Sequence, residues 1–148
     1  MDSKWLGLTL VVLLLCSLLC SLQALEVPEV VKKQVKKVHA RCVNQTGVSE
    51  AMIVETHKTQ QLPNDPTFKC FLHCMFDMFG LIDSEQVMHL ESLIEVLPET
   101  MHEKVKRLAD TCGTQKGVDA CDTVYQSIKC YMDTDGPFIR SSVDQLLG

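Results

Sequence analysis

Six cysteines between residues 42 and 130 constrain this chain of 148 residues more than any other feature of its sequence. Two further cysteines, Cys16 and Cys20, lie in an apolar N-terminal segment that we expect to be removed. An even number of cysteines in a secreted chain of this size indicates a disulfide framework, here of three bridges. Such bridges restrict the unfolded chain, so a small domain can be stable even when its core is incompletely filled.

The N-terminal segment has the form of a secretory signal peptide. A short charged start precedes an uncharged run of 21 residues from Trp5 to Leu25, with the small residue Ala24 before the expected cut. A run of this length could also anchor the chain in a bilayer. Because six cysteines follow and no other feature requires a membrane, we favour cleavage. Residues 1–24 are then the signal peptide, and residues 25–148 form one secreted, extracellular domain.

The mature chain is acidic. Without Asp2 and Lys4, 13 basic and 18 acidic residues remain, which gives a net charge of −5. This charge offers no favourable field to a nucleic acid, so we expect no nucleic-acid partner.

Six cysteines can pair in 15 ways, and helix geometry removes some of them. Cys121 and Cys130 lie nine residues apart in one expected helix, about 13 Å along its axis, whereas bonded cysteines have Cα atoms within about 7 Å. Cys70 and Cys74 lie side by side on one face of another helix, where they are better placed to bind two other segments. Excluding both pairs leaves 10 of the 15 arrangements, and the residues alone do not choose among these.

Apolar periodicity and capping residues predict an all-α chain without β-alternation or internal repeats. The third expected helix has the strongest start signal, because Asp65 is followed by Pro66. Its apolar residues cover more than half of its circumference, which indicates a central position in the fold. Asp135-Gly-Pro should end the last helix and leave an apolar tail. The six expected helices cover residues 28–44, 49–58, 66–79, 84–97, 98–112 and 119–132.

The sequence contains no recognisable catalytic or metal-binding constellation. A catalytic cysteine requires a free thiolate, and we expect all six cysteines in disulfides. Cys70, His73 and Cys74 lack the second ligand cluster of a zinc site, and Asp133-Thr-Asp135-Gly lacks the glycine and glutamate of a calcium loop. We therefore expect no enzyme and no bound metal or cofactor. The apolar third helix and the methionines instead favour a carrier of apolar molecules.

The cysteine spacing resembles that of the six-cysteine insect odorant-binding proteins. The successive gaps contain 27, 3, 37, 8 and 8 residues, and the similarity extends over nearly the whole mature chain. The general odorant-binding and pheromone-binding members of flies and mosquitoes look most alike. The local sequence is similar as well, in Cys70-Phe-Leu-His-Cys74-Met-Phe, in Leu97-Pro98 and in Val124-Tyr125-Gln-Ser-Ile-Lys-Cys130.

The resemblance implies six helices around an internal apolar pocket, with residues 133–148 as a C-terminal tail or lid. The tail runs 18 residues past Cys130, between the lengths of short-tailed and long-tailed members, which leaves open whether it enters the pocket or covers its mouth. The disulfides that the resemblance implies are Cys42–Cys74, Cys70–Cys121 and Cys112–Cys130. The residues that we expect to line the pocket are Phe68, Phe71, Leu72, Met75, Phe79, Leu90, Ile94, Leu97, Leu108, Tyr125, Ile128, Phe138 and Ile139.

The function that the resemblance implies is that of a secreted carrier, which binds small apolar odorants or pheromones and ferries them through aqueous sensory fluid to receptors. Burial would supply the affinity, at about 25 cal/mol per Å² of apolar surface, and Tyr125 is the best candidate for orienting the ligand. A non-sensory carrier of lipids with the same fold is one alternative. A disulfide-rich protein ligand or inhibitor that acts through its surface is another. We expect a monomer or a weak homodimer, with an odorant receptor as a candidate partner.

Three further features concern modification and pH. Asn44-Gln-Thr46 is an N-glycosylation sequon. His89 lies within the apolar arc of the fourth expected helix, where a buried neutral histidine would resist protonation near pH 6.5. The tail can form an amphipathic helix over the pocket, with Asp144 held by a neighbouring donor. We therefore expect binding to weaken between about pH 7 and pH 5 as the tail loosens.

Overall fold

The computed structural model describes residues 7–14 and 27–147. Residues 7–14 form a short helix, and most of the expected signal peptide, with its cleavage point, lies outside the described residues. None of the helices among the described residues is both long enough and apolar enough to cross a membrane. Val27, where the second described range begins, already has a buried side chain.

The domain is built from helices, which confirms the fold class predicted from the sequence. Within the described residues there is no strand, and an isolated antiparallel bridge joins Ile82 to Met88. The helices of the domain are α2 (Glu29–Thr46), α3 (Glu50–Thr59), α4 (Pro66–Met78), the 3-10 helix η2 (Leu90–Glu95), α5 (Glu99–Cys112) and α6 (Ala120–Leu147).

Two predicted N-cap residues fix the N-terminal ends of α3 and α4. The side chain of Ser49 accepts a hydrogen bond from the backbone N–H of Met52 at 3.1 Å, and α3 begins at the next residue. Asp65 accepts from the backbone N–H of Phe68 at 3.0 Å, and Pro66 stands in the first turn of α4. These side chains satisfy N–H groups that have no partner within the first turn of a helix.

The segment between α4 and α5 differs from the helix predicted over residues 84–97. Only Leu90–Glu95 is helical there, as a short 3-10 helix. Asp83 Oδ1 accepts hydrogen bonds from the backbone N–H groups of Glu85 and Val87, both at 2.9 Å. Gln86 has φ 63°, and the backbone N–H of Asp83 donates to the Val87 carbonyl at 3.1 Å, so the chain turns back on itself as a loop before η2.

Helix α6 is bent where the sequence predicts a break. Asp135 has φ −151° and ψ 65° inside the helix, and Pro137 follows two residues later. The chain then returns to helical geometry, so the predicted tail is the second half of α6. Asp135 Oδ1 accepts from the backbone N–H of Phe138 at 3.2 Å, and its Oδ2 accepts from Arg107 Nη2 at 2.6 Å. The first bond caps the tail helix and the second ties the bend to α5.

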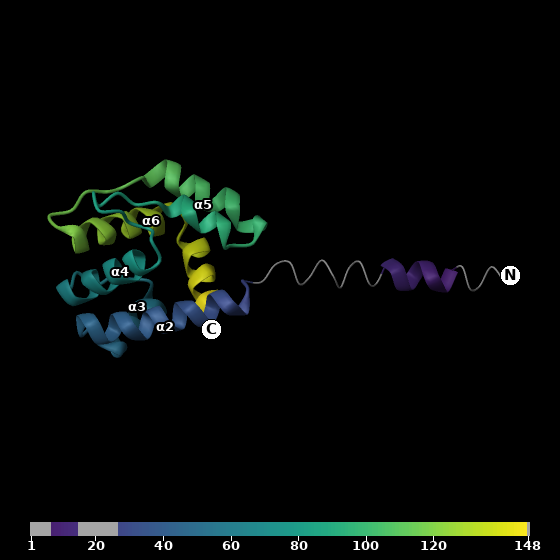
Figure 1. Cartoon of the computed structure of the whole chain (residues 1–148), viewed down its shortest axis with the longest axis horizontal. Helices are drawn as coiled ribbons and strands as arrows, with labels where there is room; N and C mark the ends of the chain where they lie inside the picture. The colour runs from purple at the N-terminus through teal and green to yellow at the C-terminus, as the bar shows by residue number, and fades with distance from the viewer. Residues whose placement is uncertain (1–6, 15–26, 148) are drawn as a thin grey trace.

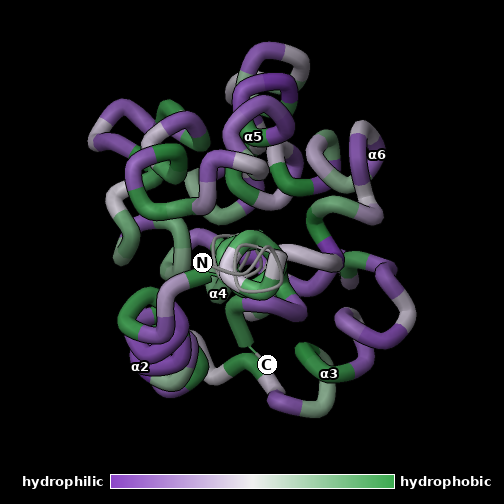
Figure 2. Tube along the Cα trace, turned by 90° about the vertical axis from the view of Figure 1, so that its right-hand side faces the viewer, coloured by the Kyte–Doolittle hydropathy of each residue, from purple (hydrophilic) through white to green (hydrophobic). Residues whose placement is uncertain are grey.

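The long helices are stacked in the order α5, α6, α4 and α2 (Figure 1). Each disulfide joins two neighbours in this stack: Cys112–Cys130 joins α5 to α6, Cys70–Cys121 joins α6 to α4, and Cys42–Cys74 joins α4 to α2. These are the pairs that the resemblance implies. The tail half of α6 runs across the stack and ends beside α2 (Figure 1). Figure 2 shows that the outer sides of α2 and α5 are largely hydrophilic, so their apolar sides face the stack.

Candidate functional site

The buried apolar side chains form two cores. The second core lies between α2 and α4 and consists of Val38, Cys42, Val48, Phe68 and Phe71. Leu62 and Leu72 pack against both cores and so mark the boundary between them. The main core draws on η2, α5 and α6 and consists of Val27, Ile82, Met88, Leu90, Met101, Val105, Leu108, Cys112, Val124, Ile128, Tyr131 and Phe138.

Half-buried apolar side chains surround the main core on the side of α4, η2 and the tail. An apolar side chain that packs on a core and stays partly accessible can be covered further by an apolar ligand, with a gain in free energy. These residues come from α4, from η2 and the turn after it, and from α6, so we take this part of the main core as the candidate binding site. They are Leu72, Phe76, Leu93, Ile94, Leu97, Met132, Ile139 and Leu146.

The structure divides the residues that the sequence predicts for the pocket. Leu90, Leu108, Ile128 and Phe138 are buried in the main core, and Ile94, Leu97 and Ile139 pack around it. Phe68 and Phe71 are buried in the second core, and Met75 and Phe79 pack around that one. Leu72 contacts both. The predicted lining is therefore split between the two cores, with Phe68 and Phe71 of α4 in the core beside α2.

Several residues at the main core are missing from the predicted lining. Met101 and Val105 follow the helical period of α5, so that pattern could have added them. Phe76 lies one residue after Met75 in the same broad apolar face of α4. Leu62 lies in a loop without periodicity, so no sequence signal pointed to it.

A groove of about 610 Å³ opens at the bend of α6. Leu62 and Met132, which line it, also pack against the main core, so the groove leads from the surface to the edge of that core. Its full lining is Gln60, Gln61, Leu62, Tyr125, Lys129, Met132, Asp133, Gly136, Pro137 and Arg140.

Tyr125 forms a wall of this groove and is itself buried. Its hydroxyl donates to the backbone carbonyl of Leu62 at 3.2 Å. Lys69 Nζ lies 4.7 Å from the centroid of the Tyr125 ring and forms an ion pair with Asp122 at 2.7 Å. The hydrogen bond from Lys69, with another from the backbone of Val118, lowers the pKa of Asp122 below its usual value. Because the Tyr125 hydroxyl donates to Leu62, its proton is engaged in that hydrogen bond.

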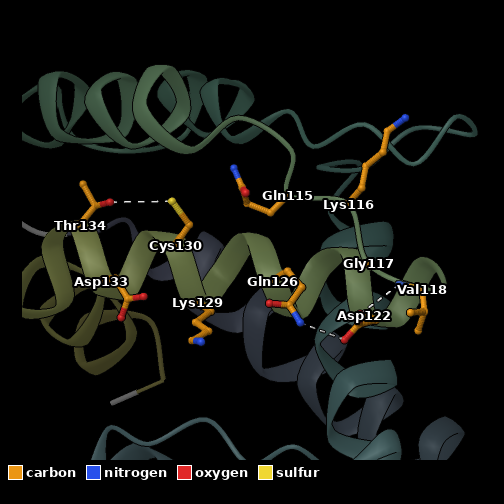
Figure 3. Close-up of a pocket in the computed structure, with 10 residues that line it drawn as sticks. All are labelled: Gln115, Lys116, Gly117, Val118, Asp122, Gln126, Lys129, Cys130, Asp133 and Thr134. Carbon is orange, nitrogen blue, oxygen red and sulfur yellow. Dashed lines mark hydrogen bonds between the residues drawn. The ribbon is translucent and has the colours of Figure 1, made fainter.

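A second hollow, of about 600 Å³, lies between α6 and the loop before it (Figure 3). Its polar groups bind one another: Asp122 accepts from the backbone N–H of Val118 at 3.1 Å and from Gln126 Nε2 at 3.3 Å. The loop lies so close to α6 that a Cβ at Gly117 would lie 2.5 Å from the backbone carbon of Asp122. We assign this hollow to the docking of the loop, because it offers no apolar surface comparable to that of the groove.

His89 does not have the buried, neutral environment expected from the sequence. Its side chain is 39% exposed, and its two ring nitrogens lie 2.9 Å from Asp83 Oδ2 and 3.2 Å from Glu91 Oε1. These carboxylates, Asp83 first, raise the pKa of His89 above its usual value. The expectation was wrong because residues 84–89 form a loop, which turns the side chain toward acidic neighbours.

The tail and the sequon have defined positions. Asp144 Oδ1 lies 2.7 Å from His57 Nε2 of α3, so the expected donor for this carboxylate is a histidine. Asn44 is exposed near the end of α2, and the Thr46 hydroxyl of the same sequon donates to the Cys42 carbonyl at 2.7 Å. Glycosylation of Asn44 stays a prediction. Among the described residues, no three His, Cys, Asp or Glu side chains gather as metal ligands would.

Three disulfides join the helices of a single domain in series, and accessible apolar side chains lie at the edge of its main core. This arrangement is that of a small disulfide-linked carrier of hydrophobic molecules. The chain belongs to the PBP/GOBP family of insect odorant-binding proteins, whose sequence profile matches residues 24–134. This is a family of carriers rather than enzymes. The match ends one residue before the bend at Asp135.

Similar proteins agree with this assignment. The chain is 49% identical to general odorant-binding protein 69a of Drosophila melanogaster over 148 residues, which is the full length of both chains. A crystal structure of the medfly odorant-binding protein CcapOBP22/CcapOBP69a shares 36% identity with a TM-score of 0.71, over 78% of this chain and 99% of that one. Odorant-binding protein 7 of Anopheles gambiae, solved with four disulfide bridges and an azo compound, shares 27% identity with a TM-score of 0.73, over 83% of this chain and 99% of that one.

Proposed function

We propose that this protein is secreted and carries a small apolar molecule, an odorant or a pheromone, through the aqueous fluid around sensory neurons to a receptor. The ligand lies at the edge of the main core, between α4, η2 and the tail half of α6. The observation that carries the proposal is the convergence of half-buried Leu72, Ile94 and Ile139 on one core from three elements.

The physical basis is burial of the ligand's apolar surface. A ligand that buries about 300 Å² of apolar surface gains about 7.5 kcal/mol before the cost of association is subtracted. The groove at the bend of α6 provides the route, because it joins the surface to Leu62 and Met132 at the core. The mosquito relative was solved in complex with an azo compound, a small molecule, which supports the same use of this fold.

Two tryptophan variants test where the ligand lies. Ile94 packs around the main core and Met75 around the second, although the sequence predicts both for one pocket. Ile94→Trp fills space at the proposed site and should weaken binding of a fluorescent apolar probe about tenfold or more, since overpacking costs about 1–3 kcal/mol. Met75→Trp serves as the matched control and should change the affinity less.

The comparison requires both variants to unfold cooperatively near the temperature of the wild type. A larger loss of affinity in Met75→Trp than in Ile94→Trp would move the site to the second core. Failure of the wild type to bind any apolar probe would contradict the carrier function itself.

A further inference from the structure

The tail half of α6 presents one side to the main core. Phe138 is buried, and Ile139 and Leu146 pack around the same core. Residues seven apart in an α-helix lie on nearly the same side, about 20° from each other. Gln145 is seven residues after Phe138, so its side chain leaves the helix on the same side as this buried residue, about 10 Å further along the axis.

The amide of Gln145 is incompletely satisfied. Its Nε2 donates to Ser141 Oγ at 3.4 Å. Its Oε1 is buried and accepts no hydrogen bond from any described residue. The neighbouring Ser142 hydroxyl is engaged, because it donates to the Phe138 carbonyl at 2.8 Å. A buried oxygen without a donor destabilises the free protein, and a leucine of similar size would avoid this cost.

The inward side of the tail carries no charge. It consists of Phe138, Ile139, Ser142, Gln145 and Leu146, while Arg140 lines the groove and Asp144 pairs with His57. Lys104 of α5 approaches this side, with Nζ 5.2 Å from the centroid of the Phe138 ring, but Gln145 Oε1 can only accept a hydrogen bond and so cannot bind an anionic headgroup. A neutral hydroxyl needs only one acceptor and fits Oε1.

We propose that Gln145 Oε1 accepts a hydrogen bond from the hydroxyl group of the bound ligand, and that the protein therefore selects long-chain or terpenoid alcohols over equally apolar molecules that cannot donate. This assignment rests on the proposed carrier function and names the ligand class for the same site. The tail then contributes to recognition of the ligand in addition to forming one wall of the binding site.

The test is a cycle of two ligands and two proteins. Dodecanol and dodecyl methyl ether have the same chain, and only the alcohol can donate a hydrogen bond. Both compete with a fluorescent apolar probe for the wild type and for Gln145→Leu. The preference of the wild type for the alcohol should fall about three- to tenfold in Gln145→Leu, as expected for one hydrogen bond in an apolar site.

Gln34→Leu provides the matched control, because Gln34 is exposed on α2 and the chemical change is the same. This variant should keep the wild-type preference. Without ligand, Gln145→Leu should melt at a higher temperature than the wild type, because it removes a buried acceptor that has no donor. Gln145→Met replaces Gln145→Leu in the cycle if the leucine variant does not fold.

An alcohol preference that is the same in the wild type and in Gln145→Leu would overturn the assignment. Failure of both dodecyl ligands to displace a probe that binds would also overturn it and leave the carrier function intact. Absence of probe binding in the wild type would instead contradict the carrier function.

Discussion

At the scale of single residues, the interpretation of His89 from the sequence predicts a pH dependence of stability opposite to the one that the structure implies. A buried neutral histidine would destabilise the protein on acidification. The observed His89 instead contacts Asp83 and Glu91, which raise its pKa. Folding then favours the protonated form, so the contribution to stability is complete below the unfolded pKa of about 6.5 and is lost as pH rises through the higher folded pKa.

We therefore expect His89→Gln to destabilise the protein at pH 6 and to leave its stability unchanged at pH 9. Urea unfolding midpoints at the two pH values measure this difference. Asp83→Asn removes the main partner and should show the same pH dependence. A loss of stability that is equal at both pH values would show that the ion pairs of His89 do not contribute.

At the scale of elements, the sequence predicted the helices whose ends have strong local signals. Asp65 and Pro66 marked the start of α4, and Asp135 marked the bend of α6. Residues 84–97 were predicted as one helix because their apolar period fits a helix. The period carries no information on the left-handed backbone of Gln86, with φ 63°, or on the bridge between Ile82 and Met88, and these make the segment a loop.

The tail is an element with a testable contribution to binding. Truncation after Ile139 removes Leu146 from the main core and the contact between Asp144 and His57. It should weaken binding of an apolar probe about five- to thirtyfold, as expected for a loss of about 1–2 kcal/mol of apolar contact. Any weakening of binding between pH 7 and pH 5 that depends on the tail should disappear in this variant.

Asp144→Asn separates the two parts of this effect. It keeps the apolar contacts and removes a pair whose side chains are 44% and 51% exposed, so the affinity should change less than about twofold. Equal losses in the truncation and in Asp144→Asn would assign the effect to the ion pair instead of the apolar wall.

At the scale of the whole molecule, cysteine spacing predicted more than apolar patterning did. The spacing pointed to the family, and the resemblance to that family implied the three disulfide pairs that the structure contains. Apolar patterning identified buried residues such as Leu108 and Phe71, but it could not assign them to one core or the other. That assignment depends on how helices far apart in sequence face each other, and a one-dimensional period contains no such information.

Secretion is a further property of the whole chain. We expect protein recovered from the medium of insect cells to begin at Leu25, as N-terminal sequencing would show. Protein found only in the membrane fraction, with residues 1–24 still attached, would contradict cleavage.

The central claim is that the interior beside the main core holds a small apolar molecule. Native mass spectrometry of the protein purified from its source tests this most directly. We predict a mass above that of the polypeptide with three disulfides by the mass of one small apolar molecule, which is lost when the protein is denatured. A native mass equal to that of the bare polypeptide, in a protein that also binds no added apolar probe, would contradict the claim.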